Sequence, residues 1–286
     1  MSSVFSKLKD RKIFSSSENE VVNYILSKPH EIIHMSIRSL AKETYTSPST
    51  VMRTCRKICP GGFGELRIKL AKEIAQFHDV MEKTPKQEAL GQKMESVDQV
   101  MNELKNSITK SIEYTQQLIN GEIIKNIVDV INKAKTIDIY GRGASNSVGA
   151  DFRYKLYRLG YNVHLFEGID LQAIQAFNSD NSHLAIIISS TGETPEIINF
   201  AKILNGNGTQ IITITSSQDC TLLQYSDYPL FFKCFETNKY VGGITSRSAM
   251  QYVLDIIYFS ILNSNYDYFS NKILNTFVPE DIGKKY

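Results

Sequence analysis

The chain has 286 residues, of which 42% are hydrophobic and 22% are charged. This balance is ordinary for a soluble globular protein, and the length suits two domains. The sequence has no apolar run near the roughly 20 residues that a membrane-spanning helix needs and no apolar signal core at its N-terminus. The composition therefore excludes a largely disordered chain, and these features predict a cytoplasmic protein.

The charge of the chain is unevenly distributed. Residues 1–84 contain 14 Lys and Arg against 9 Asp and Glu, a net charge of +5, whereas residues 85–286 contain 18 against 21, a net charge of −3. A basic first third indicates an anionic macromolecule as partner, although a solvated basic face gives the same count. No cysteine belongs to a C-x-x-C pair or has a histidine at zinc-like spacing, so we expect structural thiols and no metal at Cys55, Cys59, Cys220 and Cys234.

The first 83 residues have the pattern of a helical domain. Ser17 with Glu20 predicts a capping box before the apolar segment "VVNYILSKP", and Pro29 is expected to end that helix. Ser36 can cap a shorter helix over residues 37–43. These signals predict short helices, followed by a longer helix up to the end of the domain.

A second capping signal gives this region its most informative pattern. Ser47 is expected to cap a helix that has Pro48 at its first position. Two short helices joined by "TYT" are typical of a helix-turn-helix, although a small helical bundle that binds no DNA has the same pattern. Apolar spacing predicts a buried face at Val51, Cys55 and Ile58. The remaining residues can bind phosphates or base edges and are the candidate DNA contacts: Ser47, Ser49, Thr50, Arg53, Thr54, Arg56 and Lys57.

The rest of the chain alternates strands and helices. Mixed charge with a proline and a glycine predicts a linker over residues 84–95, between domains at 1–83 and 96–286. After two helices within residues 97–134, apolar runs predict five strands: "TIDIYG", "NVHLFE", "LAIIIS", "QIITIT" and "YPLFF". Alternation with helices requires parallel pairing and right-handed crossovers. We therefore expect an α/β fold in residues 96–286, a doubly wound parallel sheet of the flavodoxin-like α/β/α type.

Two turns rich in hydroxyl groups follow strands of this sheet, "GRGASNS" at 141–147 and "SSTGET" at 189–194. Ligands of such sheets bind beyond the carboxyl ends of the strands. Hydroxyls and backbone N–H groups at a helix N-terminus can hold an anion the size of a phosphate. The candidate groups come from Gly143, Ser145, Ser189, Thr191, Gly192 and Thr194.

Two alternatives remain for these turns. Serine and threonine at helix starts are often only N-caps. A dinucleotide site is the other alternative, because Gly141-x-Gly143 begins a G-x-G-x-x-G pattern and Glu167 ends the next strand. Against it, Asn146 occupies the third glycine position, and the second hydroxyl-rich turn has no role in such a site.

At this point the sequence resembles a known family. "FSSSENEVVNYILSKPHEIIHMSIRSLAKETYTSPSTVMRTCRKI" resembles the helix-turn-helix of the RpiR family of bacterial transcription regulators. "IDIYGRGASNSVGADFRYKL" and "AIIISSTGETPEIINFAK" resemble the sugar isomerase (SIS) domain that these regulators carry. The resemblance implies a regulator that binds operator DNA and responds to a phosphorylated sugar. It places a first-turn serine on Ser145 and the phosphate loop on Ser189, Ser190, Thr191, Gly192, Glu193 and Thr194.

Two positions depart from the family pattern. Thr191 stands where serine is commoner, and it keeps the hydroxyl but adds a methyl group. Tyr45 stands near the place where the helix-turn-helix turn usually has glycine. Either the tyrosine adopts the conformation that glycine favours or the turn is altered.

The attached DNA-binding region favours a sensor over an enzyme. We also expect no cofactor. Isomerisation of a sugar phosphate needs a positioned acid or base, and no pair is defined among the candidates Glu167, Glu193, His164 and Glu236. Of these, Glu193 is more typical of a charge at a helix N-terminus. We expect a regulator of amino-sugar or other phosphosugar metabolism that acts as a homodimer or homotetramer on a palindromic operator. The alternatives are a sugar-phosphate isomerase with an accessory helical domain and a repressor that senses NADH.

Overall fold

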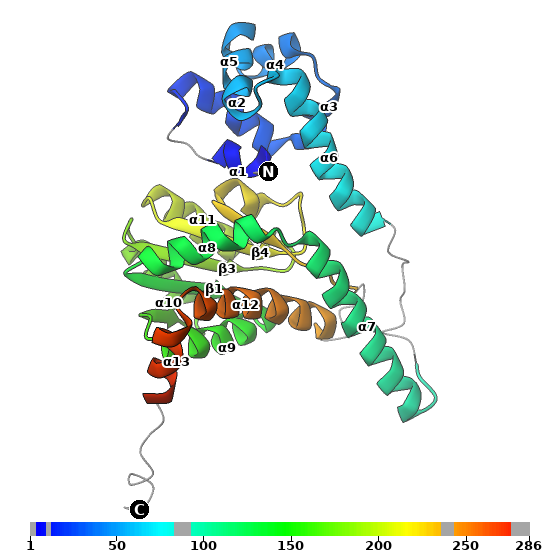
Figure 1. Cartoon of the computed structure of the whole chain (residues 1–286), viewed down its shortest axis with the longest axis vertical. Helices are drawn as coiled ribbons and strands as arrows, with labels where there is room; N and C mark the ends of the chain where they lie inside the picture. Colours follow the sequence, from blue (N-terminus) through cyan, green and yellow to red (C-terminus); the bar gives the residue numbers. More distant parts are fainter. Residues whose placement is uncertain (1–3, 10–12, 83–92, 236–242, 276–286) are drawn as a thin grey trace, which may run out of the picture. The chain divides into compact units, whose positions relative to one another are not determined.

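A computed structural model describes residues 4–9, 13–82, 93–235 and 243–275 (Figure 1). The chain divides into two compact units, Met1–Pro85 and Lys86–Tyr286. Most of the predicted linker and the acid/base candidate Glu236 lie outside the described residues. Within the described part, no helix has both the length and the apolar character needed to cross a membrane.

The first unit is a bundle of helices around one apolar core. In chain order its described helices are α1 (Val4–Lys9), α2 (Ser16–Ser27), α3 (Pro29–His34), α4 (Ile37–Glu43), α5 (Pro48–Ile58) and α6 (Gly62–Glu82). The predicted buried face of α5 is confirmed, since Val51, Cys55 and Ile58 are at most 1% exposed. Burial raises the pKa of the Cys55 thiol to about 12, so this cysteine is a protonated part of the core.

Two expectations for this unit were wrong in detail. The capping box of α2 lies at Ser15 and Glu18, two residues before the predicted pair, and the Glu18 carboxylate accepts from the Ser15 N–H at 2.7 Å. Helix α3 was not predicted, because Pro29 was interpreted only as the end of α2. Pro29 is in fact the first residue of α3, a position where its missing N–H costs no hydrogen bond.

The second unit has the predicted doubly wound α/β fold. Its strands are β1 (Thr136–Gly141), β2 (Val163–Leu165), β3 (His183–Ile188), β4 (Gln210–Thr215) and β5 (Tyr228–Phe231). They pair in parallel in the order β2-β1-β3-β4-β5, the flavodoxin-like order. The helices are α7 (Val97–Leu118), α8 (Gly121–Lys133), α9 (Ala144–Arg158), α10 (Ile169–Asn178), α11 (Pro195–Gly206), the short 3₁₀ helix η2 (Thr221–Tyr225), α12 (Ile244–Ser264) and α13 (Tyr266–Asn275).

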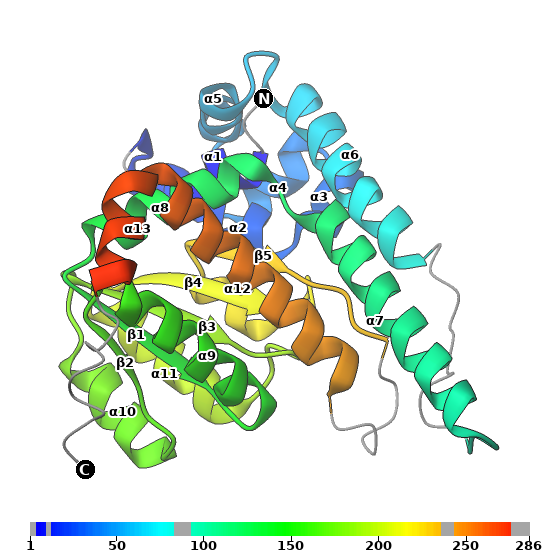
Figure 2. The same cartoon turned by 60° about the horizontal axis from the view of Figure 1, so that its bottom comes forward.

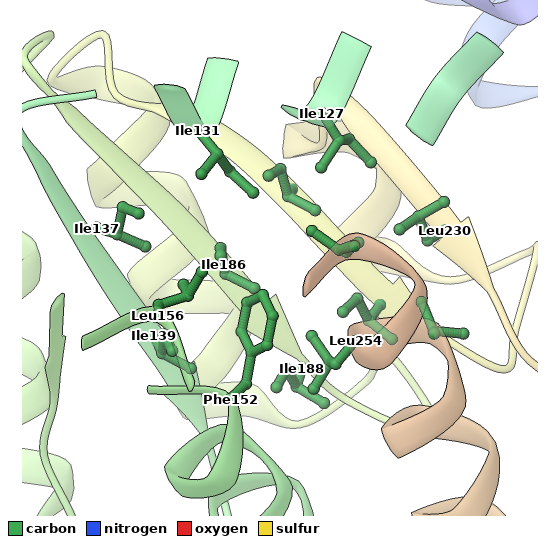
Figure 3. Packing of buried hydrophobic residues seen from close by; sticks show 14 of the residues in the cluster. Ile127, Ile131, Ile137, Ile139, Phe152, Leu156, Ile186, Ile188, Leu230 and Leu254 are labelled. Carbon is green, nitrogen blue, oxygen red and sulfur yellow. The ribbon is translucent and has the colours of Figure 1, made fainter. Parts of the chain in front are cut away.

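Helices cover both faces of this sheet, as its buried apolar strands require. On one face, side chains of α8, α9 and α12 pack against alternate residues of the strands, and Figure 3 shows Phe152 and Leu254 among them, near Ile188. On the other face, α10, α11 and η2 pack around Tyr140 and Ile187. Helix α7 runs beside α12 (Figure 2). The described part of α12 begins at Ile244.

Candidate functional site

The two hydroxyl-rich turns meet at the carboxyl edge of the sheet. Gly141, the last residue of β1, is in register with Ile188, the last residue of β3. The chain then enters α9 on one face of the sheet and α11 on the other. The strand order reverses between these two strands, which is where open α/β sheets bind their ligands. The topology therefore brings the two predicted turns together at one site.

The turn after β3 has an internal structure that depends on its glycine. Ser189 is 4% exposed, and its hydroxyl accepts a hydrogen bond from the Gly192 N–H at 3.2 Å. The Thr191 hydroxyl accepts one from the Glu193 N–H at 3.2 Å. Gly192 has a φ of +67°, and a Cβ there would lie 2.2 Å from the Cys220 Sγ atom. Only glycine fits this position without a rearrangement.

The same turn is fastened to the neighbouring part of the unit. The Ser190 carbonyl accepts hydrogen bonds from the Thr215 hydroxyl and from the backbone and side chain of Ser216, at 2.7–3.2 Å. The Glu193 carboxylate accepts from the N–H and the hydroxyl of Thr221 at 2.6 and 2.9 Å. Glu193 therefore caps η2, where the sequence had suggested a charge at the start of its own helix.

The hydroxyl groups of the site are not simple helix caps. Thr194 is the N-cap residue of α11, but its side chain makes no capping hydrogen bond. Gly143, with a φ of +57°, precedes α9. Ser145 lies in the first turn of α9 and is 7% exposed, and its hydroxyl is 3.8 Å from the Met250 sulfur. The N-cap alternative therefore does not explain Thr194 or Ser145.

Sequence reasoning missed two features of this edge. Arg142, between the glycines of "GRG", forms an ion pair at 2.7 Å with Glu196 in the first turn of α11, so that it joins the two turns. The start of α12 lies against the start of α9: a Cβ atom added at Gly243 would be 3.6 Å from the Ala144 Cβ atom. Arg142 could have been singled out in the sequence by its position between the two glycines. Its partner, Glu196, is 54 residues away, and the sequence does not indicate it.

One acid/base candidate belongs to a separate polar cluster between the sheet and α10. The carboxylate of Asp138, 1% exposed, lies 3.1 Å from His164 Nδ1 and 2.6 Å from His183 Nδ1. It also accepts from Gln175 Nε2 at 2.9 Å and from the Ser179 hydroxyl at 3.1 Å. These contacts supply the hydrogen bonds that a buried carboxylate needs, and they connect α10 to three strands. His164 therefore has a structural role.

The helix-turn-helix forms in the first unit as α4, a short turn and α5 (Figure 1). Ser36 and Ser47 accept capping hydrogen bonds at 3.0 and 3.1 Å, as their positions predicted. Tyr45 has a φ of +50°, and it is the only residue other than glycine with a positive φ in the described part of the chain. Its side chain is 98% exposed. The tyrosine thus adopts the conformation that the family pattern gives to glycine.

The structure separates the candidate DNA contacts into three groups. Ser47, Ser49, Arg53, Arg56 and Lys57 are exposed, and Thr50 is half-buried. Thr54 is 0% exposed, so its assignment to the outward face was wrong. Its hydroxyl donates to the Thr50 carbonyl at 2.8 Å, which allows a polar side chain to be buried in a helix. A surface hollow next to α5 is lined by Ile37, Pro48, Ser49, Met52, Arg53, Arg56 and Lys57.

Two of these basic residues contact a buried acid. Arg53 Nε donates to Glu18 Oε1 at 2.9 Å, and Lys57 Nζ donates to Glu18 Oε2 and to the Ile13 carbonyl, both at 2.7 Å. Burial alone would raise the pKa of Glu18, but hydrogen bonds from Lys57, Ser15 and Arg53 lower it to about 2. Lys57 therefore connects α5 to the start of α2, and it also adds a positive charge at the surface.

Comparison with known families agrees with both units. The helix-turn-helix domain of the rpiR family matches residues 6–77, and the SIS domain matches residues 130–257. The chain belongs to the RpiR family. Its two domains occur in the order that the sequence motifs indicated, with the hydroxyl-rich turns inside the SIS match and α4 and α5 inside the other.

Relatives of similar length support this assignment. An uncharacterised HTH-type transcriptional regulator of Clostridium perfringens is 28% identical over 262 residues, 92% of each chain. The HTH-type transcriptional regulator HexR of Escherichia coli is 27% identical over 85% of this chain and 82% of HexR. The Vibrio vulnificus NanR protein, whose structure is described as complexed with ManNAc-6P, matches 96% of each chain with 26% identity and a TM-score of 0.59. This RpiR-family chain is thus a transcriptional regulator with a helix-turn-helix domain and a SIS domain.

Proposed function

We propose that this regulator binds operator DNA through α5 and that a sugar phosphate bound between the β1 and β3 turns changes its affinity for DNA. The observation that carries the proposal is the meeting of the two hydroxyl-rich turns at the point where the strand order reverses. The similarity to NanR, described as complexed with ManNAc-6P, supports a phosphosugar effector. An amino-sugar phosphate is therefore the first class of effector to test.

The chemistry of the site suits a sensor of metabolite concentration. Ser189, Thr191 and Thr194 supply neutral hydroxyl groups, and the N-termini of α9 and α11 face the same edge. A hydrogen bond to a charged group contributes about 1.5–3 kcal/mol, and a helix terminus adds about 0.3–1 kcal/mol. After the costs of ordering a ligand, several such contacts support micromolar to millimolar affinity.

The state of two of the four acid/base candidates supports sensing over isomerisation. Glu193 accepts two hydrogen bonds from Thr221, and His164 contacts Asp138 in the cluster that holds α10. Neither side chain is free to act as a base in this arrangement. An assay for interconversion of aldose and ketose phosphates tests this directly, and sustained turnover by the wild-type protein would favour the isomerase.

On the DNA side, the proposed contacts are the predicted residues of α5 and its cap that are exposed or half-exposed: Ser47, Ser49, Thr50, Arg53, Arg56 and Lys57. Two copies of α5 in a homodimer or homotetramer would contact successive half-sites of a palindromic operator. The sugar phosphate would favour one arrangement of the DNA-binding domains, with a coupling free energy of roughly 1–3 kcal/mol.

The effector site is tested by substitution with a matched control. Ser189→Ala and Thr194→Ala should each weaken binding of the effector sugar phosphate, measured by calorimetry or by the ligand-induced rise in thermal midpoint. Ser270→Ala removes an exposed hydroxyl that donates to the Tyr266 carbonyl of α13, and it should leave binding unchanged. Unchanged affinity in both site variants would place the effector elsewhere.

A further inference from the structure

We propose that Glu18 orients Arg53 for contact with a DNA base, so that sequence discrimination depends on a buried carboxylate that lies outside α5. This inference rests on the proposed DNA-binding function and adds a positioning residue to it. Glu18 itself is 1% exposed and is too deeply buried to contact DNA. Its effect must therefore act through the side chains that it holds.

The Glu18 carboxylate is held in place by hydrogen bonds to both of its oxygens. Oε1 accepts from Arg53 Nε at 2.9 Å, whereas Oε2 accepts from the Ser15 N–H and from Lys57 Nζ, both at 2.7 Å. Lys57 is fastened in turn to the Ile13 carbonyl. The carboxylate thus connects the start of α2 to the middle and the end of α5, and its orientation is set by several donors.

Arg53 presents an unused edge of its guanidinium group to solvent. Its side chain is 61% exposed, and its Nε–H donates to Glu18. Within the described residues, its two terminal nitrogens have no hydrogen-bond partner. Because the guanidinium group is planar, fixing the Nε–H direction restricts the plane in which the terminal nitrogens lie. That edge has the geometry for two hydrogen bonds to O6 and N7 of a guanine, the commonest specific arginine contact in the major groove.

Glu18 also lowers the positive charge of the surface next to DNA. Replacing it with glutamine keeps a similar shape but adds one unit of net positive charge near Arg53 and Lys57. Affinity for any DNA should then rise, because phosphate contacts depend on charge. Discrimination between bases should fall, because the hydrogen bond that orients Arg53 loses its carboxylate acceptor and is weakened. A purely structural role for Glu18 predicts a fall in both affinities together.

The test uses the full-length protein and two DNA duplexes. One duplex carries the sequence that the wild-type protein selects from random DNA, and the other has its specifically recognised guanines replaced. We expect Glu18→Gln to bind the second duplex at least as tightly as the wild type and to lose roughly tenfold in the ratio of the two affinities. Glu20→Gln is the matched control, because it removes one negative charge from an exposed position on the same helix and should keep the wild-type ratio.

A double variant separates orientation of Arg53 from other effects. Arg53→Ala should lower the ratio at least as much as Glu18→Gln, and adding Glu18→Gln to Arg53→Ala should lower it little further. If Glu18→Gln keeps the wild-type ratio while Arg53→Ala loses it, or if the two losses add in full, the inference is wrong. If the wild type selects no sequence at all, the proposed DNA function fails first and this inference fails with it.

A measurement on the unmodified protein covers the case in which Glu18→Gln does not fold. The Nε–H groups of arginines give separate nuclear magnetic resonance signals. Arg53 should show a higher Nε–H order parameter than Arg56, which is exposed on the same helix and should be flexible with a value below about 0.6. Equal mobility of the two arginines in the free protein would overturn the proposal.

Discussion

Gly192→Ala should destabilise the SIS unit, for two reasons that can be measured separately. Gly192 has a φ of +67°, and the left-handed conformation costs a residue with a Cβ about 1–2 kcal/mol. The added Cβ would lie 2.2 Å from the Cys220 Sγ atom and 2.8 Å from its Cβ atom. Overpacking of this kind costs about 1–3 kcal/mol. The expected loss in free energy of unfolding is therefore roughly 2–5 kcal/mol.

A second variant removes only the overlap. Cys220→Gly deletes the two atoms that would lie closer than 3 Å to the new Cβ and leaves the Thr215 Oγ1 atom at 3.3 Å. In that background Gly192→Ala should therefore cost little more than the backbone part, about 1–2 kcal/mol. The assay is urea dependence of hydrogen exchange at the amides of β3 and β4, which reports on the SIS unit within the full-length chain. Equal costs of Gly192→Ala in both backgrounds, or a cost below about 1 kcal/mol in the wild type, would show that the Cys220 side chain does not limit this position.

Three further predictions concern single residues. Tyr45→Gly should stabilise the first unit by roughly 0.5–1 kcal/mol, because it relieves a left-handed tyrosine with an exposed side chain; hydrogen exchange in α4 and α5 should show this gain, and Tyr45→Ala should show none. The pKa of Glu18 is lowered from 4.5 to about 2, so the stability it contributes, at most roughly 3 kcal/mol, is present above pH 4.5 and lost as the pH falls toward 2. The difference in unfolding free energy between Glu18→Gln and wild type should shrink over that range, and a constant difference would contradict the prediction. Glu193→Gln should cost the SIS unit about 1 kcal/mol by weakening the cap on Thr221, and an unchanged urea midpoint would count against that contact.

The features that local patterns specify were predictable from the sequence. Ile186 to Ile188 are buried on both faces of the sheet, and their unbroken apolar run predicted one of its parallel strands. The alternation of strands and helices predicted the topology, and the topology placed the two hydroxyl-rich turns at one edge. Ser47 and Pro48 predicted the start of α5, since N-cap chemistry depends only on neighbouring residues.

The errors arose where a local pattern had two solutions. Both Ser15 with Glu18 and Ser17 with Glu20 match a capping box, and only the first pair places its glutamate in the core. Thr54 was assigned to the surface because it is polar, but a hydrogen bond to the preceding turn allowed its burial.

Other features depend on pairs that are distant in sequence. Glu18 lies 35 residues from Arg53, and Arg142 lies 54 residues from Glu196. Charge and spacing carry no information about such pairs, because any exposed arginine in the unit could have met any acid. These contacts become visible only when the packing of the helices and strands is known.

Control of DNA binding by a sugar phosphate is tested by the affinity of the full-length protein for its selected operator, measured with and without sugar phosphates. A panel of amino-sugar, hexose and pentose phosphates, with inorganic phosphate and the unphosphorylated sugars as controls, identifies the effector. We expect one phosphosugar to change operator affinity by roughly 5- to 150-fold in either direction, and Ser189→Ala to shift that response to higher ligand concentration. An operator affinity that stays unchanged at saturating concentrations of every sugar phosphate would show that the SIS domain does not control DNA binding through such a ligand.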